Sequence, residues 1–173
     1  MPRRNLHAPV RASSALQREF PQMDRRSTEV LINLIRTDSL VTTALSRRFR
    51  HHGLSLSGFN ALVILRQAPE GVNPHEIADR LLVTRAAVTG ILDALESKGF
   101  IHRAPSGEDG RMSLIAITPA GRKLLDELLP EHFAAERAMA AALSANEKEL
   151  LITLLGKLQL HLAAKSEDLT VAE

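Results

Sequence analysis

One continuous segment, from residue 78 to residue 121, constrains the fold of this chain more than any other part of it. It begins with two short stretches in which apolar residues recur at helical spacing. A strand pattern at 100–103, a polar loop at 104–112 and a returning strand pattern at 114–117 follow. Two helices followed by a hairpin predict a winged helix-turn-helix, in which the hairpin is the wing.

Longer helices are predicted on both sides of this segment. Apolar residues recur at helical spacing from Ser27 to His52, and again after a capping box formed by Ser144 and Glu147. Each helix is too long and too apolar to serve only as cover for a small winged-helix core, and an amphipathic helix must bury its stripe. A second copy of the chain is the expected partner, because twofold homo-oligomers are the commonest kind, and packing within one chain is the alternative.

The predicted fold is therefore mainly α, with a two-stranded β wing as its minor β part and with long N- and C-terminal dimerisation helices. The expected domains are, in order, a basic N-terminal extension at 1–26, a main domain at 27–163 and a tail at 164–173. Within the main domain we expect the dimerisation helices at 27–53 and 119–163 and the winged helix-turn-helix at 55–118.

Composition excludes several function classes. The absence of cysteine from the 173 residues excludes a disulfide framework and thiol redox sensing. No apolar run approaches the roughly 20 residues of a membrane span, and the N-terminus lacks a secretory signal, so we expect no membrane association and a cytoplasmic protein. With aromatic residues at 3%, single-stranded nucleic acid has little to stack on, which favours double-stranded DNA as the partner.

Positive charge is concentrated in the N-terminal half, although the formal net charge is only +2. Residues 1–26 hold six arginines against two acids, and 36–66 hold five against one. Two interpretations of the first 26 residues stay open. They are a loosely ordered terminus, as is common, or a basic arm that touches DNA.

The predicted recognition helix begins at Thr84 and carries outward-facing side chains that suit DNA. The N-terminal residues of such a helix lie against base edges in the major groove. Arg85 can donate to guanine, Thr84 and Thr89 can bind a base or a phosphate, and Ala86 keeps the helix slim near the groove floor. The alternative interpretation of this face is a solvated surface.

Four further residues complete the predicted DNA contacts. Arg111, near the tip of the wing, can enter a minor groove. Asp109 beside it is better explained as a partner that fixes Arg111 or the wing backbone, because an acid facing phosphate is repelled. Arg103 at the base of the wing is a candidate phosphate contact. The helix start at Asn73 can present backbone amides to a phosphate.

Residues 57–121 resemble the MarR family of winged helix-turn-helix transcriptional regulators. The resemblance is carried by Asp79-Arg80-Leu81 before Val83-Thr84, by Val88-Thr89, by the helix end from Leu95-Glu96 to Gly99-Phe100-Ile101, by Asp109 and Arg111, and by Thr118 with Gly121. With the flanking helices it covers about 27–163. It implies a homodimer on a pseudo-palindromic operator, repression relieved by a small aromatic or anionic ligand, and a wing in which Arg111 enters the minor groove with Asp109 as its partner.

A ligand of that kind can meet the basic end of the first long helix, formed by Arg47, Arg48, Arg50, His51 and His52. The alternative is a solvated helix end whose positive charge interacts favourably with the helix dipole. We expect no metal and no cofactor, because the histidines lack ligand spacing.

The motifs of nucleotide-binding and hydrolytic enzymes are absent, so the chain is not expected to be an enzyme. The competing function is a winged-helix module for protein interaction or structure without specific DNA binding.

Overall fold

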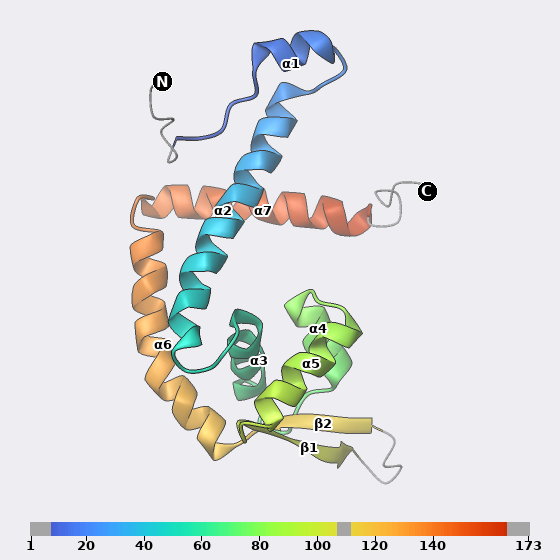
Figure 1. Ribbon diagram of the computed structural model, residues 1–173, viewed down its shortest axis with the longest axis vertical. Helices are drawn as coiled ribbons and strands as arrows, with labels where there is room; N and C mark the ends of the chain where they lie inside the picture. Colours follow the sequence, from blue (N-terminus) through green and yellow to red (C-terminus); the bar gives the residue numbers. More distant parts are fainter. Residues whose placement is uncertain (1–7, 107–111, 166–173) are drawn as a thin grey trace. The chain divides into compact units, whose positions relative to one another are not determined.

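The computed structural model describes residues 8–106 and 112–165 of the chain. Its elements, coloured along the sequence in Figure 1, are α1 (Ser14–Glu19), α2 (Arg25–Arg50), α3 (Leu56–Arg66), α4 (Pro74–Leu81), α5 (Arg85–Glu96), β1 (Ile101–Ser106), β2 (Met112–Ile117), α6 (Pro119–Met139) and α7 (Ala145–Ala164). They form two compact units, Met1–Leu125 and Asp126–Glu173. The prediction of a mainly α fold with a two-stranded β wing is confirmed.

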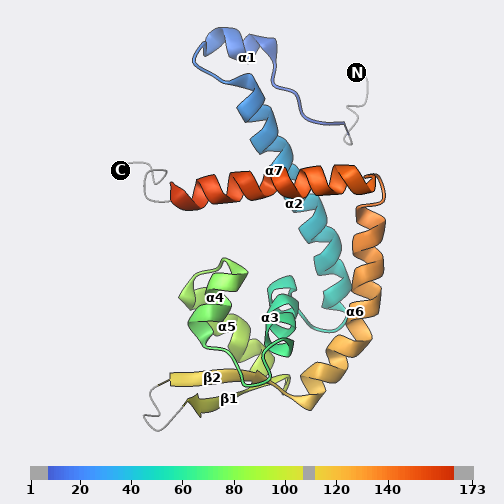
Figure 2. The same ribbon diagram turned by 180° about the vertical axis from the view of Figure 1, so that it is seen from behind.

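The first unit contains the winged helix-turn-helix, in which α3, α4 and α5 pack with the β1–β2 hairpin (Figures 1 and 2). The hairpin is antiparallel and pairs Ile101 with Ile117. Val72, just before α4, forms an isolated bridge to Ile115 of β2, which ties the start of α4 to the hairpin. The core of this unit includes Leu62, Leu65, Ile77, Val88, Leu92, Leu95, Ile101 and Ile115, all buried.

The end of α2 joins this core through an aromatic pair. The rings of Phe49 in α2 and Phe59 in α3 stack with centroids 4.2 Å apart. Both side chains are buried. The last turn of α2 is therefore fixed against α3, and the side chains that follow it lie beside the winged helix.

Each helix of the helix-turn-helix begins at a side-chain cap, as the sequence indicates. The Asn73 side chain accepts from the N–H of His75 at 2.8 Å, and Thr84 accepts from the N–H of Ala87 at 3.2 Å. Glu76, three residues after Asn73, stands at the spacing of a capping box but does not reach back to complete one. Its carboxylate binds Arg80, one turn further on, at 2.5 Å.

The turn from α4 into α5 uses a Schellman arrangement. The N–H of Val83 donates to the Ala78 carbonyl at 3.1 Å, and the N–H of Leu82 to that of Asp79 at 3.2 Å. Such a turn needs a left-handed residue, and Leu82 fills this position with φ of 52°. Its side chain is 93% exposed, so no burial offsets the cost of roughly 1 kcal/mol that a non-glycine residue incurs there.

The junction between the hairpin and α6 is closely packed. The Thr118 hydroxyl donates to the Gly99 carbonyl at 2.6 Å and accepts from the N–H of Gly121 at 3.1 Å. A Cβ at Gly121 would collide with the Phe100 carbonyl oxygen and lie 2.9 Å from Ile117 Cγ1. Only glycine fits this position, which explains why the segment opening α6 carries one.

The second unit contains the end of α6 and all of α7. α6 continues through Pro130 without ending there. The predicted capping box at α7 is confirmed, since the Ser144 N–H donates to Glu147 at 2.8 Å and the Ser144 side chain accepts from the Glu147 N–H. α7 buries none of its residues.

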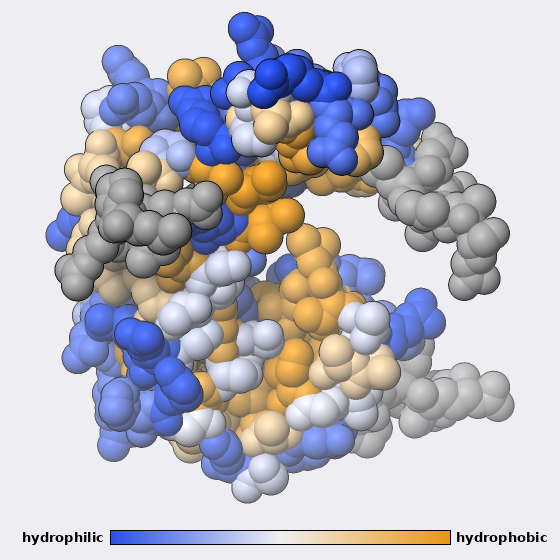
Figure 3. Space-filling view, turned by 45° about the horizontal axis from the view of Figure 1, so that its top comes forward, coloured by the Kyte–Doolittle hydropathy of each residue, from blue (hydrophilic) through white to orange (hydrophobic). Residues whose placement is uncertain are grey.

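Apolar side chains remain at the surface on several helices (Figure 3). In α7 the exposed set is Leu150, Leu151, Ile152, Leu154, Leu160 and Leu162, and in α2 it is Val30, Leu31, Ile32, Ile35, Leu40 and Val41. None of the helices within the described ranges is long and apolar enough to cross a membrane.

One of the two interpretations of the N-terminal extension was a loosely ordered terminus. Residues 8–20 do not fit this interpretation, because they are folded and bound to α2. Residues 14–19 form α1, and the segment before it is hydrogen-bonded to α2. The anchoring side chains, Glu29 and Asn33, lie about 20 residues further along the chain.

Candidate nucleic-acid interface

The first turns of α5 present the residues that sequence reasoning chose for base contact. Val88, Leu92 and Leu95 point into the core, which leaves the opposite side of the helix in solvent. The structure brings the four predicted residues together on this exposed side, which carries Thr84, Arg85, Ala86 and Thr89. We call these four residues the α5 face.

Hydrogen bonds within α5 fix two of these side chains. The Thr84 hydroxyl oxygen accepts from the Ala87 N–H as the helix cap, and the Thr89 hydroxyl donates to the Arg85 carbonyl at 3.1 Å. Arg85 is the first residue of the helix, and its exposed guanidinium has five donors in a planar fork. The α5 face therefore offers one bidentate donor between two hydroxyls of fixed orientation.

Arg103 lies at the base of the wing, as expected, but its charge is shared. Its guanidinium binds Asp93 of α5 at 2.6 Å and also pairs with Glu96. The hydrogen bond that Arg103 donates to Asp93 raises the pKa of Arg103, and the charge of Glu96 adds to this effect. The pair of carboxylates links the end of α5 to β1, and a phosphate would have to compete with them for this arginine.

Asn73 supports the start of α4 through its own side chain. Its side-chain oxygen accepts from the His75 N–H, so a phosphate at the first turn of α4 would have to compete with this cap for that N–H. Pro74 at the first helical position has no N–H to offer.

Asp109 and Arg111 lie outside the described residues, between the strands that flank them.

The basic end of α2 is exposed at all five predicted ligand positions, Arg47, Arg48, Arg50, His51 and His52. A cavity of about 270 Å³ begins at the next residue, Gly53. Its opposite wall is formed by Ala87, Gly90, Ile91 and Ala94 of α5, and Lys98 lies at its edge. The Lys98 ammonium donates to the Gly53 carbonyl. The loop after α2 and one side of α5 thus share one cavity.

Sequence reasoning missed two features of this region. The first is the pair of acids that holds Arg103, although Asp93 and Glu96 stand three residues apart, at the spacing of helical neighbours. The second is Lys98, which is 45 residues from its partner Gly53 and carries no local signal of that contact. Among the described residues, no group of three or more metal-ligating side chains is present.

Comparison with known proteins gives consistent matches. The model of the MarR family matches residues 54–113. The regulator PecS of Dickeya dadantii is 33% identical over 146 residues, covering 83% of this chain and 88% of PecS. The repressor YetL of Bacillus subtilis is 32% identical over 140 residues, covering 80% of this chain and 84% of YetL.

Solved structures match in fold. The complex of Staphylococcus aureus MepR with DNA has a TM-score of 0.68 at 23% identity, covering 75% of this chain and 94% of MepR. BpsR of Bordetella bronchiseptica, whose DNA binding is regulated by 6-hydroxynicotinic acid, has a TM-score of 0.69 at 21% identity, covering 76% of this chain and 98% of BpsR.

Proposed function

Because the chain belongs to the MarR family of transcriptional regulators, we propose that it is a sequence-specific repressor that binds double-stranded DNA and releases it when a small aromatic or anionic ligand binds. The single observation that carries this proposal is the α5 face. It places Arg85, the first residue of the recognition helix, between the hydroxyls of Thr84 and Thr89.

In this proposal the α5 face enters the major groove with its N-terminal end first. Arg85 donates both arms of its fork to the O6 and N7 atoms of a guanine, and the small Ala86 side chain lets the helix approach. Arg111 holds the minor groove with Asp109 as its partner, by resemblance to the family. Arg103 and the first turn of α4 at Asn73 bind the phosphates on either side.

Two copies act together in the proposed complex. The exposed leucines of α7 and the exposed apolar residues of α2 are side chains that water solvates poorly in each of the two units. Burial of these side chains in a homodimer supplies the driving force, and the twofold axis of the dimer matches a pseudo-palindromic operator. The protein acts where the DNA is, in the cytoplasm.

In this proposal, DNA is released when a ligand binds in the cavity beside α5. A flat ligand in this cavity would contact Ala87, Gly90 and Ile91 on one side of the recognition helix, and its negative group would compete with the Gly53 carbonyl for Lys98. The neighbouring basic end of α2 attracts an anion to the opening. The regulation of BpsR by 6-hydroxynicotinic acid, a flat aromatic carboxylic acid, supports this class of ligand.

The proposal is tested by the salt dependence of DNA affinity. A regulator that neutralises several phosphates loses affinity steeply as salt rises, because counterions are released on binding. We expect a steep salt dependence with duplex DNA, and weaker binding in the presence of 6-hydroxynicotinic acid or benzoate. Absent or salt-insensitive binding would instead favour the protein-interaction module.

A further inference from the structure

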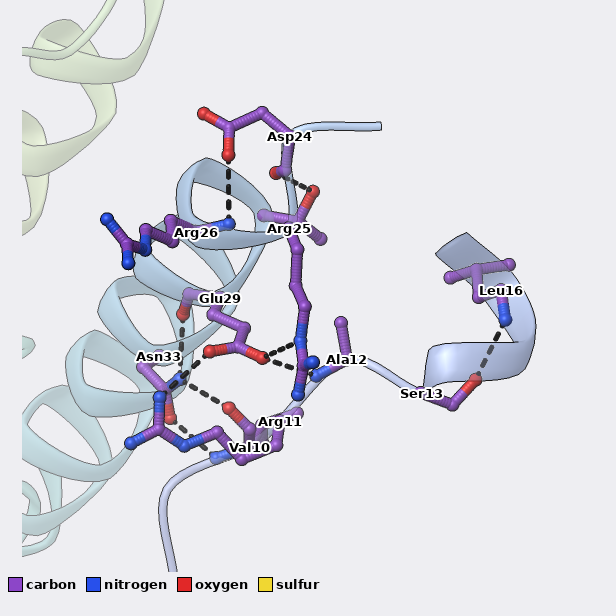
Figure 4. A network of polar contacts seen from close by, with 11 residues as sticks. Val10, Arg11, Ala12, Ser13, Leu16, Asp24, Arg25, Arg26, Glu29 and Asn33 are labelled. Atoms are coloured by element: carbon purple, nitrogen blue, oxygen red, sulfur yellow. Dashed lines mark hydrogen bonds and ion pairs between the residues drawn. The ribbon is translucent and has the colours of Figure 1, made fainter. Parts of the chain in front are cut away.

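The segment before α1 is bound to α2 by a set of polar contacts that we call the Glu29 clamp (Figure 4). Glu29 accepts from the guanidinium groups of Arg11 at 2.8 Å and Arg25 at 2.9 Å, and from the backbone N–H of Ala12 at 3.0 Å. Glu29 is 8% exposed, whereas the side chains of its partners Arg11 and Arg25 stay 73% and 43% exposed. These three donors hold the carboxylate in one orientation.

Asn33, one turn along α2, completes the clamp by binding the peptide backbone. Its side-chain oxygen accepts from the Val10 N–H at 2.8 Å, and its amide donates to the Val10 carbonyl at 2.9 Å. The same amide nitrogen donates to the Glu29 carbonyl at 2.7 Å, which fixes its direction. The Asn33 side chain thus binds both the backbone N–H and the backbone carbonyl of Val10, as a neighbouring β-strand would.

The clamp orders a helix that has no packing of its own. α1 has six residues and buries none of them. An isolated helix of this length is unstable in water, because nucleation is unfavourable and few hydrogen bonds follow it. Ser13 caps α1 by accepting from the Leu16 N–H at 3.1 Å, directly after the clamped residues. The clamp and this cap therefore hold α1 in place at the cost of chain entropy.

The side chains that α1 displays are apolar. Leu16 is 42% exposed, and Phe20 at the end of the helix is 44% exposed. The neighbouring start of α2 exposes further apolar residues, Val30, Leu31, Ile32 and Ile35. An ordered helix that keeps apolar side chains in water is unfavourable by itself, so a partner surface is the natural reason for it.

We propose that residues 8–20 are a built part of the interface with a second copy of this chain, in which Leu16 and Phe20 pack on the partner. This inference rests on the homodimer of the proposed function. A second copy suits the surface because it brings the same apolar side chains of α1 and α2, and a twofold axis makes such a surface complementary to itself. DNA is a poor occupant, since the side chains that this segment exposes at Leu16 and Phe20 are apolar and Arg11 is paired with Glu29.

The first test removes the apolar contacts and leaves the clamp intact. The double variant Leu16→Ala/Phe20→Ala and the control Leu82→Ala, which shortens an equally apolar and more exposed side chain in the winged helix, are compared with the full chain. The dimer dissociation constant is measured by sedimentation over a dilution series. We expect roughly tenfold or more weakening for the double variant and no change for the control.

The second test releases the segment without changing any charge. Asn33→Ala removes both bonds to Val10, and we expect faster trypsin cleavage after Arg11 together with a weaker dimer. If the wild type is a dimer and the double variant dimerises equally well, this inference is wrong but the proposed function is not affected. The same holds if Asn33→Ala is cleaved faster but its dimer is as stable as that of the wild type. A wild-type chain that is monomeric would overturn the assembly in the proposed function as well.

Discussion

In the proposed complex, Arg85 is the residue on which base recognition depends most. Because it is the first residue of α5, its side chain projects beyond the helix start, where a groove-binding helix meets the bases. The core residues of the same helix fix the direction of this projection. An arginine in this position is a bidentate donor with little backbone freedom, which is what discrimination of guanine requires.

Arg85→Ala should weaken binding to the preferred DNA by about 1–3 kcal/mol and relax the preference at one base pair in each half-site. Arg137→Ala, which removes the same charge in the second unit, is the control. Affinities are measured for the preferred site and for single-base variants at fixed salt. An equal loss on all sequences would mean that Arg85 binds a phosphate and not a base.

Gly121 allows a sharp test of packing at a single residue. Gly121→Ala should lower the free energy of unfolding by about 1–3 kcal/mol, because the new methyl group meets the Phe100 carbonyl and Ile117. Gly90→Ala is the matched control. Nothing lies within 4 Å of a Cβ at Gly90, so alanine inside the helix should stabilise by roughly 0.5–1 kcal/mol. Urea unfolding at one protein concentration measures both, and equal effects would contradict the close packing at Gly121.

At the scale of elements, the helix starts were predictable because their signals are local. Asn73 before Pro74, Thr84 before α5 and the Ser144–Glu147 pair are each contained within four residues. Glu76 shows the limit of such signals, since Arg80 one turn ahead offers a charged partner that competes with the helix cap.

The unpredicted contacts of Glu29 with Arg11 and of Asp93 with Arg103 join residues that no local spacing relates. Glu29 meets Arg11 only because the first residues fold back along α2, and Asp93 meets Arg103 only because the chain reverses at Gly99. The α5 face was predictable as a set because helical spacing alone separates it from Val88 and Leu92. The cavity at Gly53 was not, because it depends on how the loop after α2 approaches α5.

The Glu29 clamp gives a prediction on pH. Hydrogen bonds from Arg11 and Arg25 lower the pKa of Glu29 from 4.5 to about 2. Since the folded pKa is the lower one, the unfolded chain takes up the proton first, and the clamp stabilises fully above pH 4.5. This stabilisation is lost as the pH falls from about 4.5 to about 2.

The unfolding free energy of wild type minus that of Glu29→Gln isolates this effect from the other carboxylates. The difference should be constant from pH 7 to about pH 5 and shrink toward pH 2. A difference that does not depend on pH would show that the ionised carboxylate contributes nothing beyond what the neutral amide contributes.

At the scale of the whole molecule, α7 is an element whose apolar side chains are left in water. It buries none of its residues, and its leucines repeat along the helix. Truncation after Leu143 should therefore abolish the dimer while the winged helix, which lies in the other unit, stays folded. Removal of residues 166–173 alone is the control and should leave the dimer intact. Sedimentation gives the assembly state and circular dichroism the fold, and a folded dimer without α7 would contradict the proposed assembly.

Selection of binding sites from random duplex DNA tests the central proposal most directly. Two copies that each place an α5 face in the major groove should enrich an inverted repeat whose half-site centres lie about one helical turn, roughly 10 base pairs, apart. The enriched sites should contain a guanine that Arg85→Ala no longer selects. Enrichment of no sequence, or of a single unpaired site, would contradict a twofold regulator that reads DNA through the α5 face.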